Sequence, residues 1–232
     1  MTSILLEVSW LPLWVSFRAA ALATGFALLF GLPSARWVSG LSRRSRWFVD
    51  GLFTLPMVLP PTVLGFFLLM IFGRNSPIGL LVEAIGQRVV FSWQATVIAA
   101  TLVAFPLVYR TCLAAMQQID QDLFSAARTL GLGEVEIFFR IYLPLSAPGI
   151  ATGAILGFAR ALGEFGATLM LAGNIPGRTQ TMPMAVFFSA EAGRMDIALF
   201  WVLLITVISF SVVFLVNKIN DSAGRGQRYA TS

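Results

Sequence analysis

Five long apolar runs, separated by shorter polar stretches, dominate the pattern of hydrophobic and polar positions along this chain. An apolar helix of about 20 residues is long enough to cross the hydrocarbon core of a bilayer. The runs lie at about residues 10–32, 49–72, 93–116, 147–172 and 197–216. The pattern therefore predicts an all-α membrane protein with five transmembrane helices, in one transmembrane domain spanning residues 1–232.

The longest polar interval between apolar runs, at about residues 120–145, contains the stretch SAARTLGLGEVEIFFRIYLP. Two short helices, Asp122–Leu130 and Glu134–Tyr142, are predicted there, with Pro144 ending the second. Gly131 lies in the turn between them, and we expect it to adopt a backbone conformation that a Cβ atom would strain. We call residues 120–145 the elbow.

Small residues leave one surface of the first elbow helix almost bare. Ala126 and Ala127, which follow Ser125, allow another chain to approach the backbone closely. No side chain of the elbow has the character of a catalytic group. The elbow is therefore suited to docking a partner, and the alternative is an ordinary amphipathic hairpin lying on the membrane surface.

Two of the apolar runs contain residues that disturb or crowd a helix. In the second run, Pro60 and Pro61 precede Thr62 and interrupt the hydrogen-bond ladder, which is tolerated only where protein or a cavity covers the freed carbonyls. With Pro56 and Gly65 of the same run, these three residues are candidates for lining a conduction path, and a simple kink is the alternative. In the fourth run, glycines recur every four residues and predict close helix packing, within the subunit or against a second copy. They are Gly149, Gly153 and Gly157.

Charged residues are rare within the runs. Arg160 and Glu164 are four positions apart and are expected on one helix face. Either charge alone near the bilayer centre would cost about 2.5–3.5 kcal/mol. We therefore expect the two to pair, as a purely structural pair or as part of a gate or substrate path. Arg18 in the first run could attract an anion, or it could extend to the outer head groups or pair with an acid.

Composition excludes several classes of protein. Hydrophobic residues make up 57% of the chain, charged residues 12%, and the mean hydropathy is +0.82, which favours the membrane over water as solvent. The net charge of +5 comes from scattered arginines without a basic stripe, so nucleic acid is not an expected partner. The absence of histidine excludes histidine metal ligands, and Cys112 is the only cysteine. The only lysine, Lys218, precedes Ile219, so a nucleotide-binding P-loop is absent. We predict no metal and no cofactor bound by this chain.

The distribution of basic residues predicts the orientation in the membrane. In the five-span topology, with a loop at residues 33–48, ten basic residues fall on the elbow side and four on the other. We therefore expect the elbow and the C-terminus in the cytoplasm and the N-terminus outside. The ten are Arg36, Arg43, Arg44, Arg46, Arg110, Arg128, Arg140, Lys218, Arg225 and Arg228, and the four are Arg74, Arg88, Arg178 and Arg194.

The spacing within the elbow resembles the cytoplasmic loop signature of ATP-binding-cassette (ABC) importer permeases. That signature reads EAA, three residues, G, nine residues, I-x-L-P, and Ser125 stands here in place of its glutamate. The resemblance implies a type I ABC importer permease in which the elbow is the coupling loop to an ATPase. The residues that carry it are Ser125, Ala126, Ala127, Gly131, Ile141, Leu143 and Pro144.

Two further stretches resemble the permeases of molybdate importers: LPMVLPPTVLGF from Leu55 and FARALGEFGATLMLAGNIPGRTQTMPMAV from Phe158. The resemblance implies a homodimer in the bacterial inner membrane, two ABC ATPase subunits that bind ATP-Mg, an extracytoplasmic oxyanion-binding protein, and alternating access. Sulfate and tungstate permeases share this architecture and remain alternatives. A secondary transporter would carry coupling acids in several spans, whereas Glu164 is the only acid deep in one. A membrane enzyme is disfavoured by the absence of histidine and of any nucleophile motif.

Overall fold

The computed structural model describes the backbone of residues 8–230 and the side chains of residues 8–219. The regular secondary structure in this part of the chain is entirely helical, as the sequence predicts. The helices are α2 (Leu11–Ser39), α3 (Arg43–Val58), α4 (Pro61–Phe72), α5 (Pro77–Ala84), α6 (Trp93–Gln117), α7 (Gln121–Thr129), α8 (Glu134–Ile137), the π-helix η1 (Phe138–Tyr142), α9 (Leu143–Leu162), α10 (Gly166–Ala172), α11 (Met182–Glu191) and α12 (Met195–Ala230).

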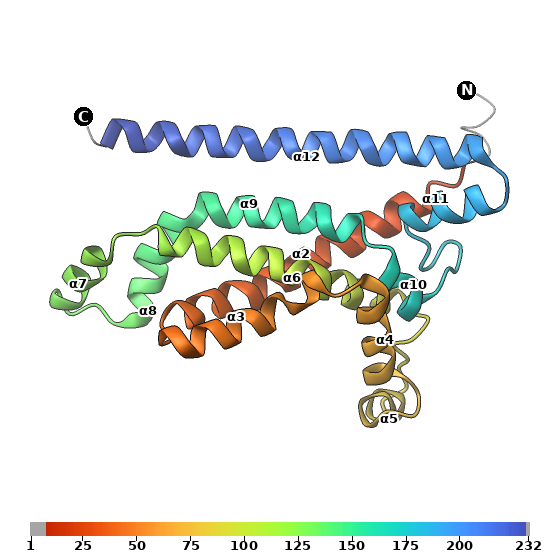
Figure 1. Cartoon of the computed structure of the whole chain (residues 1–232), viewed down its shortest axis with the longest axis horizontal. Coiled ribbons are helices and arrows are strands. Elements are labelled where there is room, and N and C mark those ends of the chain that lie inside the picture. Colours follow the sequence, from red (N-terminus) through yellow and green to blue (C-terminus); the bar gives the residue numbers. More distant parts are fainter. Residues whose placement is uncertain (1–7, 231–232) are drawn as a thin grey trace.

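Figure 1 shows α2, α3, α6, α9 and α12 running along the long axis of the molecule. The elbow helices α7 and α8 lie at one end, together with the end of α12. The beginning of α2, α10 and α11 lie at the other end, where α4 and α5 extend to one side. Among the residues that the structure describes, four helices are long and apolar enough to cross a membrane, and the bent pair α3–α4 would make a fifth span.

The core forms where α2 and α9 pack against α6, and small residues bring their backbones together. In α2, Ala19, Ala23 and Ala27 are buried at intervals of four. In α9, the predicted glycine stripe lies against α6 of the same chain. A Cβ built at Gly153 would lie 3.1 Å from Thr111 Cβ. In lipid, where apolar burial gives little driving force, such close van der Waals packing holds helices together.

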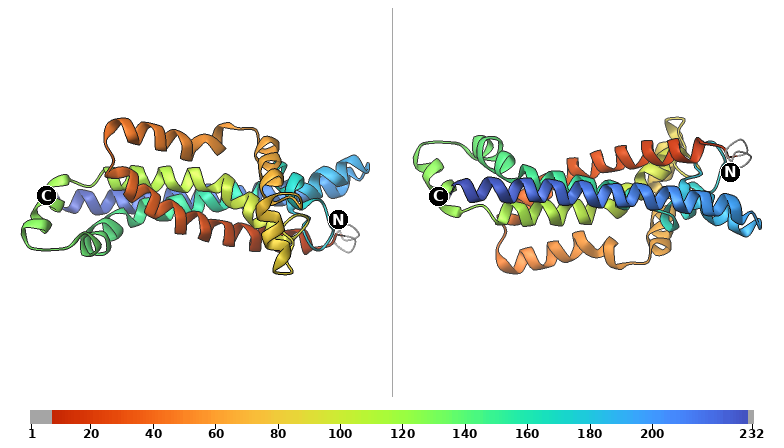
Figure 2. Two further views of the ribbon diagram at one scale, coloured as in Figure 1. Left: turned by 90° about the horizontal axis from the view of Figure 1, so that it is seen from below. Right: turned by 90° about the horizontal axis from the view of Figure 1, so that it is seen from above.

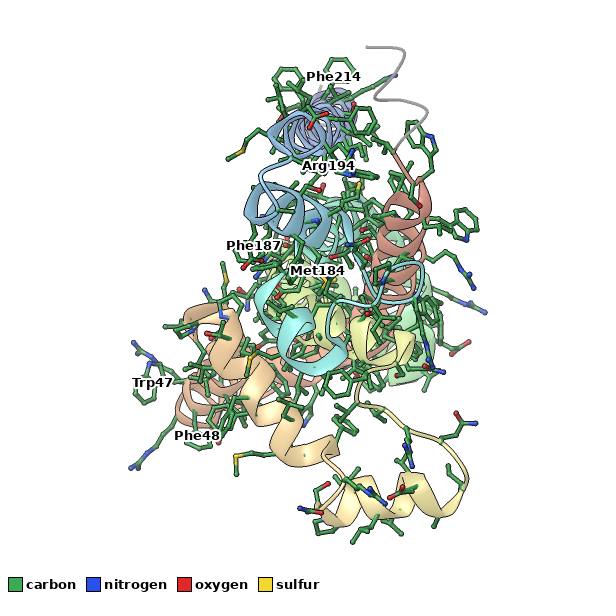
Figure 3. All side chains as sticks on the ribbon, turned by 90° about the vertical axis from the view of Figure 1, so that its right-hand side faces the viewer. Trp47, Phe48, Met184, Phe187, Arg194 and Phe214 are labelled. Atoms are coloured by element: carbon green, nitrogen blue, oxygen red, sulfur yellow. The ribbon has the colours of Figure 1, made fainter. Side chains whose placement is uncertain are left out.

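Helices α3 and α12 lie at the edges of the bundle and present apolar side chains outward. Figure 2 shows α3 alongside the bundle and α12 along another side. Trp47 and Phe48 of α3 and Phe214 of α12 point away from the other helices (Figure 3) and are exposed. Exposed apolar side chains of this kind suit contact with lipid or with another membrane subunit.

The loop expected at residues 33–48 is mostly helical. Helix α2 continues through Pro33 to Ser39, and only three residues separate it from Arg43, the first residue of α3. Ala35 and Val38 are fully buried in the core. Burial of these side chains therefore outweighs the local cost of a proline inside a helix.

The second and fourth apolar runs are broken helices. Pro56, also expected to interrupt the second run, remains inside α3. The break lies at Leu59 and Pro60, which have extended backbone, and the chain bends there by 108° between α3 and α4. The fourth run was expected to be one helix over residues 147–172. It is interrupted at residues 163–165, between α9 and α10. Tertiary packing of both breaks, described below, explains why an apolar run does not form a single helix.

Candidate coupling and gating sites

The elbow forms a helix–turn–helix whose geometry depends on two residues. The Asp120 carboxylate accepts a hydrogen bond from the backbone N–H of Asp122 at 3.0 Å and caps α7. Gly131 has φ +83°, a left-handed conformation that favours glycine. No atom outside its immediate neighbours lies within 4 Å of a Cβ built there. The backbone conformation, and not lack of space, therefore makes glycine suitable at this turn.

An aromatic stack closes the inside of the elbow. The rings of Phe124 and Tyr142 lie 4.1 Å apart and nearly parallel, and both side chains are buried. Ala127 is also buried, so it does not contribute to the bare outer surface expected from the sequence. Ser125 and Ala126 are exposed, and the Ser125 hydroxyl donates to the Gln121 carbonyl at 3.3 Å. Of the three small residues at the start of the signature, only Ser125 and Ala126 are therefore available to a partner.

The outer surface of the elbow carries large apolar side chains that the sequence interpretation missed. Leu130 is 81% exposed and Val135 is 71% exposed. Leu123 and Phe139, elsewhere in the elbow, are also exposed. Large apolar side chains concentrated on a short segment mark an interaction surface. Their exposure depends on how α7 and α8 fold against each other, which no local hydrophobic pattern specifies.

The elbow continues directly into α9. Pro144 was expected to end the second elbow helix, but the chain remains helical from Glu134 to Leu162. Proline lacks an N–H and its ring crowds the carbonyl four residues earlier. The π-helical turn η1 accommodates it, with the Leu143 N–H donating to the Phe138 carbonyl. Ile141 packs against the core, so a displacement of the elbow would act on α9 without an intervening loop.

At the other end of the bundle, the two helix breaks meet. A Cβ built at Gly166, the first residue of α10, would lie 3.0 Å from Pro61 Cβ and 3.3 Å from the Thr62 backbone nitrogen. A Cβ built at Gly65 of α4 would lie 2.9 Å from Ala167 Cα. Helices α4 and α10 therefore pack backbone against backbone, and Figure 1 shows them side by side. Pro60, Pro61 and Thr62 keep exposed surface at this junction.

The predicted pair of charges spans the second break. Arg160 Nη1 lies 3.0 Å from Glu164 Oε2, and the Glu164 side chain is 2% exposed whereas Arg160 is 38% exposed. Glu164 Oε1 accepts a hydrogen bond from the Ala167 N–H at 2.8 Å. One buried carboxylate thus links the end of α9 to the beginning of α10.

The remaining candidate charges have structural partners. The Arg18 guanidinium lies over the rings of Trp93 and Trp14, at 5.1 and 5.7 Å from their centroids, which are distances of cation–π contact. In the elbow, the hydrogen bond to Glu134 raises the pKa of Arg128 above its ordinary value, so Arg128 stays charged. In the part of the chain that the structure describes, no three His, Cys, Asp or Glu residues could together hold a metal ion.

Residues 27–223 match the protein family described as "Binding-protein-dependent transport system inner membrane component". The chain is 44% identical over 208 residues to the putative molybdenum transport system permease protein YvgM of Bacillus subtilis (strain 168), covering 89% of this chain and 92% of that protein. It is 42% identical over 185 residues to the molybdenum transport system permease protein ModB of Escherichia coli (strain K12), covering 79% and 81%.

Solved structures with a similar fold include the inward-facing MetNI methionine ABC transporter. The TM-score is 0.65 at 19% identity, covering 90% of this chain and 96% of that one. A bacterial alginate ABC transporter in complex with alginate pentasaccharide-bound periplasmic protein gives a TM-score of 0.66 at 18% identity, covering 90% and 78%. At these identities the likeness shows the fold alone.

The ion pair at the second break predicts non-additive substitutions. Arg160→Met and Glu164→Gln should each lower folded yield and melting temperature in detergent, because each leaves one charge or one buried polar group unmatched. The double variant should recover much of the loss, with a coupling of about 1–2 kcal/mol. The exposed pair Glu136–Arg140 has the same four-residue spacing and a 3.4 Å contact, and the matching substitutions there should show almost no coupling. Additive losses at Arg160 and Glu164 would contradict a structural pair.

Proposed function

Because the chain belongs to the family of binding-protein-dependent transport system inner membrane components, we propose that it is the membrane-spanning subunit of an ABC importer that moves molybdate into the cytoplasm. The family match extends over most of the chain. The two relatives described above are 44% and 42% identical and carry molybdenum transport in their names. The observation that carries the proposal is the elbow, because its spacing and exposed apolar surface suit docking to an ATPase.

In this proposal the partner ATPase binds and hydrolyses ATP-Mg. The elbow is docked to that ATPase and moves with it. The continuous helix from Glu134 to Leu162 passes that movement to α9. The Arg160–Glu164 pair then links α9 to α10, which packs against α4 through Gly65 and Gly166. The junction of α4 and α10 is therefore the proposed gate, and alternating access is a change in how the two broken helices pack.

Two copies of the chain, each with an ATPase, would enclose the pathway between them. The exposure of Arg160 and of the Pro60–Thr62 segment supports a path along this surface. Few cationic side chains lie in the spans, which suits a permease that must release its anion quickly. The extracytoplasmic binding protein would dock at the end opposite the elbow. There, Arg74, Arg88 and Arg178 line a cavity of about 570 Å³ together with Glu83, which pairs with Arg74 and Arg88 and leaves an excess of positive charge.

The orientation proposed from the basic residues places the elbow in the cytoplasm of a bacterial inner-membrane protein. The structure supports this arrangement because the elbow and the end of α12 lie at the same end of the bundle (Figure 1). The beginning of α2 lies at the other end, as a chain with an odd number of crossings requires.

The function is tested by uptake in a strain that lacks its own molybdate permease. The chain, expressed with its ATPase and binding protein, should restore ATP-dependent molybdate uptake. Uptake of sulfate without molybdate would reassign the anion. Molybdate uptake that persists when the ATPase is omitted would contradict an ABC importer and favour a secondary transporter.

The elbow's part in coupling is tested at its turn. Gly131→Val places a β-branched residue at φ +83°, which costs on the order of 1–3 kcal/mol locally. The variant should insert in the membrane at normal yield, yet bind the ATPase more weakly and lose most uptake. Gly133→Val is the matched control, because Gly133 has φ −74° and ψ 160°, where valine is unstrained. If Gly131→Val transported molybdate as well as Gly133→Val and the unmodified protein do, the conformation of this turn would have no part in coupling.

A further inference from the structure

We propose that Glu134 is a positioning residue that braces the elbow against the end of α2, so that movement of the ATPase reaches α2 as well as α9. This inference rests on the proposed function. It concerns a carboxylate outside the signature residues, and it assigns to that carboxylate a role in the efficiency of coupling and not in docking.

The brace consists of one carboxylate whose two oxygens are both engaged. Glu134 Oε2 accepts a hydrogen bond from Arg36 Nη2 at 2.7 Å, and Oε1 accepts one from Arg128 Nε at 2.8 Å. Arg36 lies in the last turn of α2, Arg128 in the last turn of α7, and Glu134 is the first residue of α8. A single side chain therefore connects three helices, and the Arg36 contact joins positions 98 residues apart in the sequence.

An aromatic contact reinforces the same connection. The Arg36 guanidinium lies 4.7 Å from the centroid of the Tyr142 ring, a cation–π distance. Tyr142 in turn stacks on Phe124 at the centre of the elbow. Arg36 thus contacts the elbow at two places, the carboxylate on α8 and the ring in η1, which fixes the orientation of the elbow relative to α2.

The position of the brace explains why coupling needs it. Arg128 and Glu134 lie on opposite sides of the Gly131 turn, so their ion pair holds α7 and α8 at one angle. Without it, α7 could rotate about the turn while α8 stayed in place. Part of any displacement applied by the ATPase would then be absorbed at Gly131 before it reached α9 or α2.

The exposure of the pair argues against a role in stability. The side chains of Glu134 and Arg128 are 55% and 53% exposed. Ion pairs exposed to this degree contribute little to the free energy of unfolding, because water screens them and ordering two long side chains costs entropy. Removing the carboxylate should therefore leave the protein folded, and its effect on coupling can be measured separately.

The test uses the complete importer, with both ATPases and the binding protein, reconstituted in proteoliposomes. The measured quantity is the number of ATP molecules hydrolysed per molybdate transported. Glu134→Gln should raise this ratio several-fold, with melting temperature and ATPase association unchanged. Arg36→Gln should also raise it, and the effect of the double variant should be smaller than the two single effects combined, because the substitutions share the Arg36–Glu134 contact.

Glu136→Gln is the matched control, because Glu136 pairs with Arg140 along one helix and does not span the turn. Its ratio should equal that of the unmodified protein. A normal ratio in both Glu134→Gln and Arg36→Gln would overturn the brace, and so would loss of ATPase association, since Glu134 would then be a docking contact. If the unmodified complex transports no molybdate, the proposed function fails instead, so the two failures are distinguishable.

Discussion

A bilayer offers no hydrogen-bond partners to a broken helix, and this constraint governs where the chain can depart from regular helix. Both breaks in the apolar runs are therefore placed against each other. The Pro60 carbonyl accepts from the N–H groups of Val63 and Leu64, and the Glu164 carboxylate accepts from the Ala167 N–H. Gly65 and Gly166 let the two segments approach backbone to backbone. The irregular region that results is packed between α4 and α10 on one side and keeps exposed surface at Pro60, Pro61 and Thr62 on the other.

The rest of the structure connects this junction to the elbow at the other end of the bundle. Helix α9 is the direct connection, because it continues from the elbow through η1 and ends at the break. Its glycine stripe packs against α6, where a Cβ built at Gly157 would lie 2.5 Å from Val108 Cγ2, so α9 and α6 fit closely together. Helix α2 provides a second connection through Arg36 and Glu134. A movement of the elbow would thus act on two of the three central helices.

The sequence alone predicted the helical membrane class, the elbow with its left-handed glycine, and α6 nearly to its ends, since these features follow from local pattern and spacing. It did not predict that Pro33 and Pro144 remain helical, because the burial of Ala35 and Val38 and the π-turn η1 decide those positions. The break at residues 163–165 was also missed, because the apolar residues on both sides of Gly163 and Glu164 made the run long enough to be taken as one helix. Contacts between distant positions, such as Arg36 with Glu134, cannot be predicted from the periodic pattern of hydrophobic residues.

The central claim is that the elbow docks to an ATPase through its exposed apolar surface, and site-specific cross-linking tests it most directly. In a Cys112→Ala background, Leu130→Cys on the elbow should cross-link to the ATPase in the assembled complex. Leu81→Cys, which is 70% exposed on α5 at the opposite end, should not. An assembled and active complex that cross-links through position 81 and not through position 130 would contradict the account.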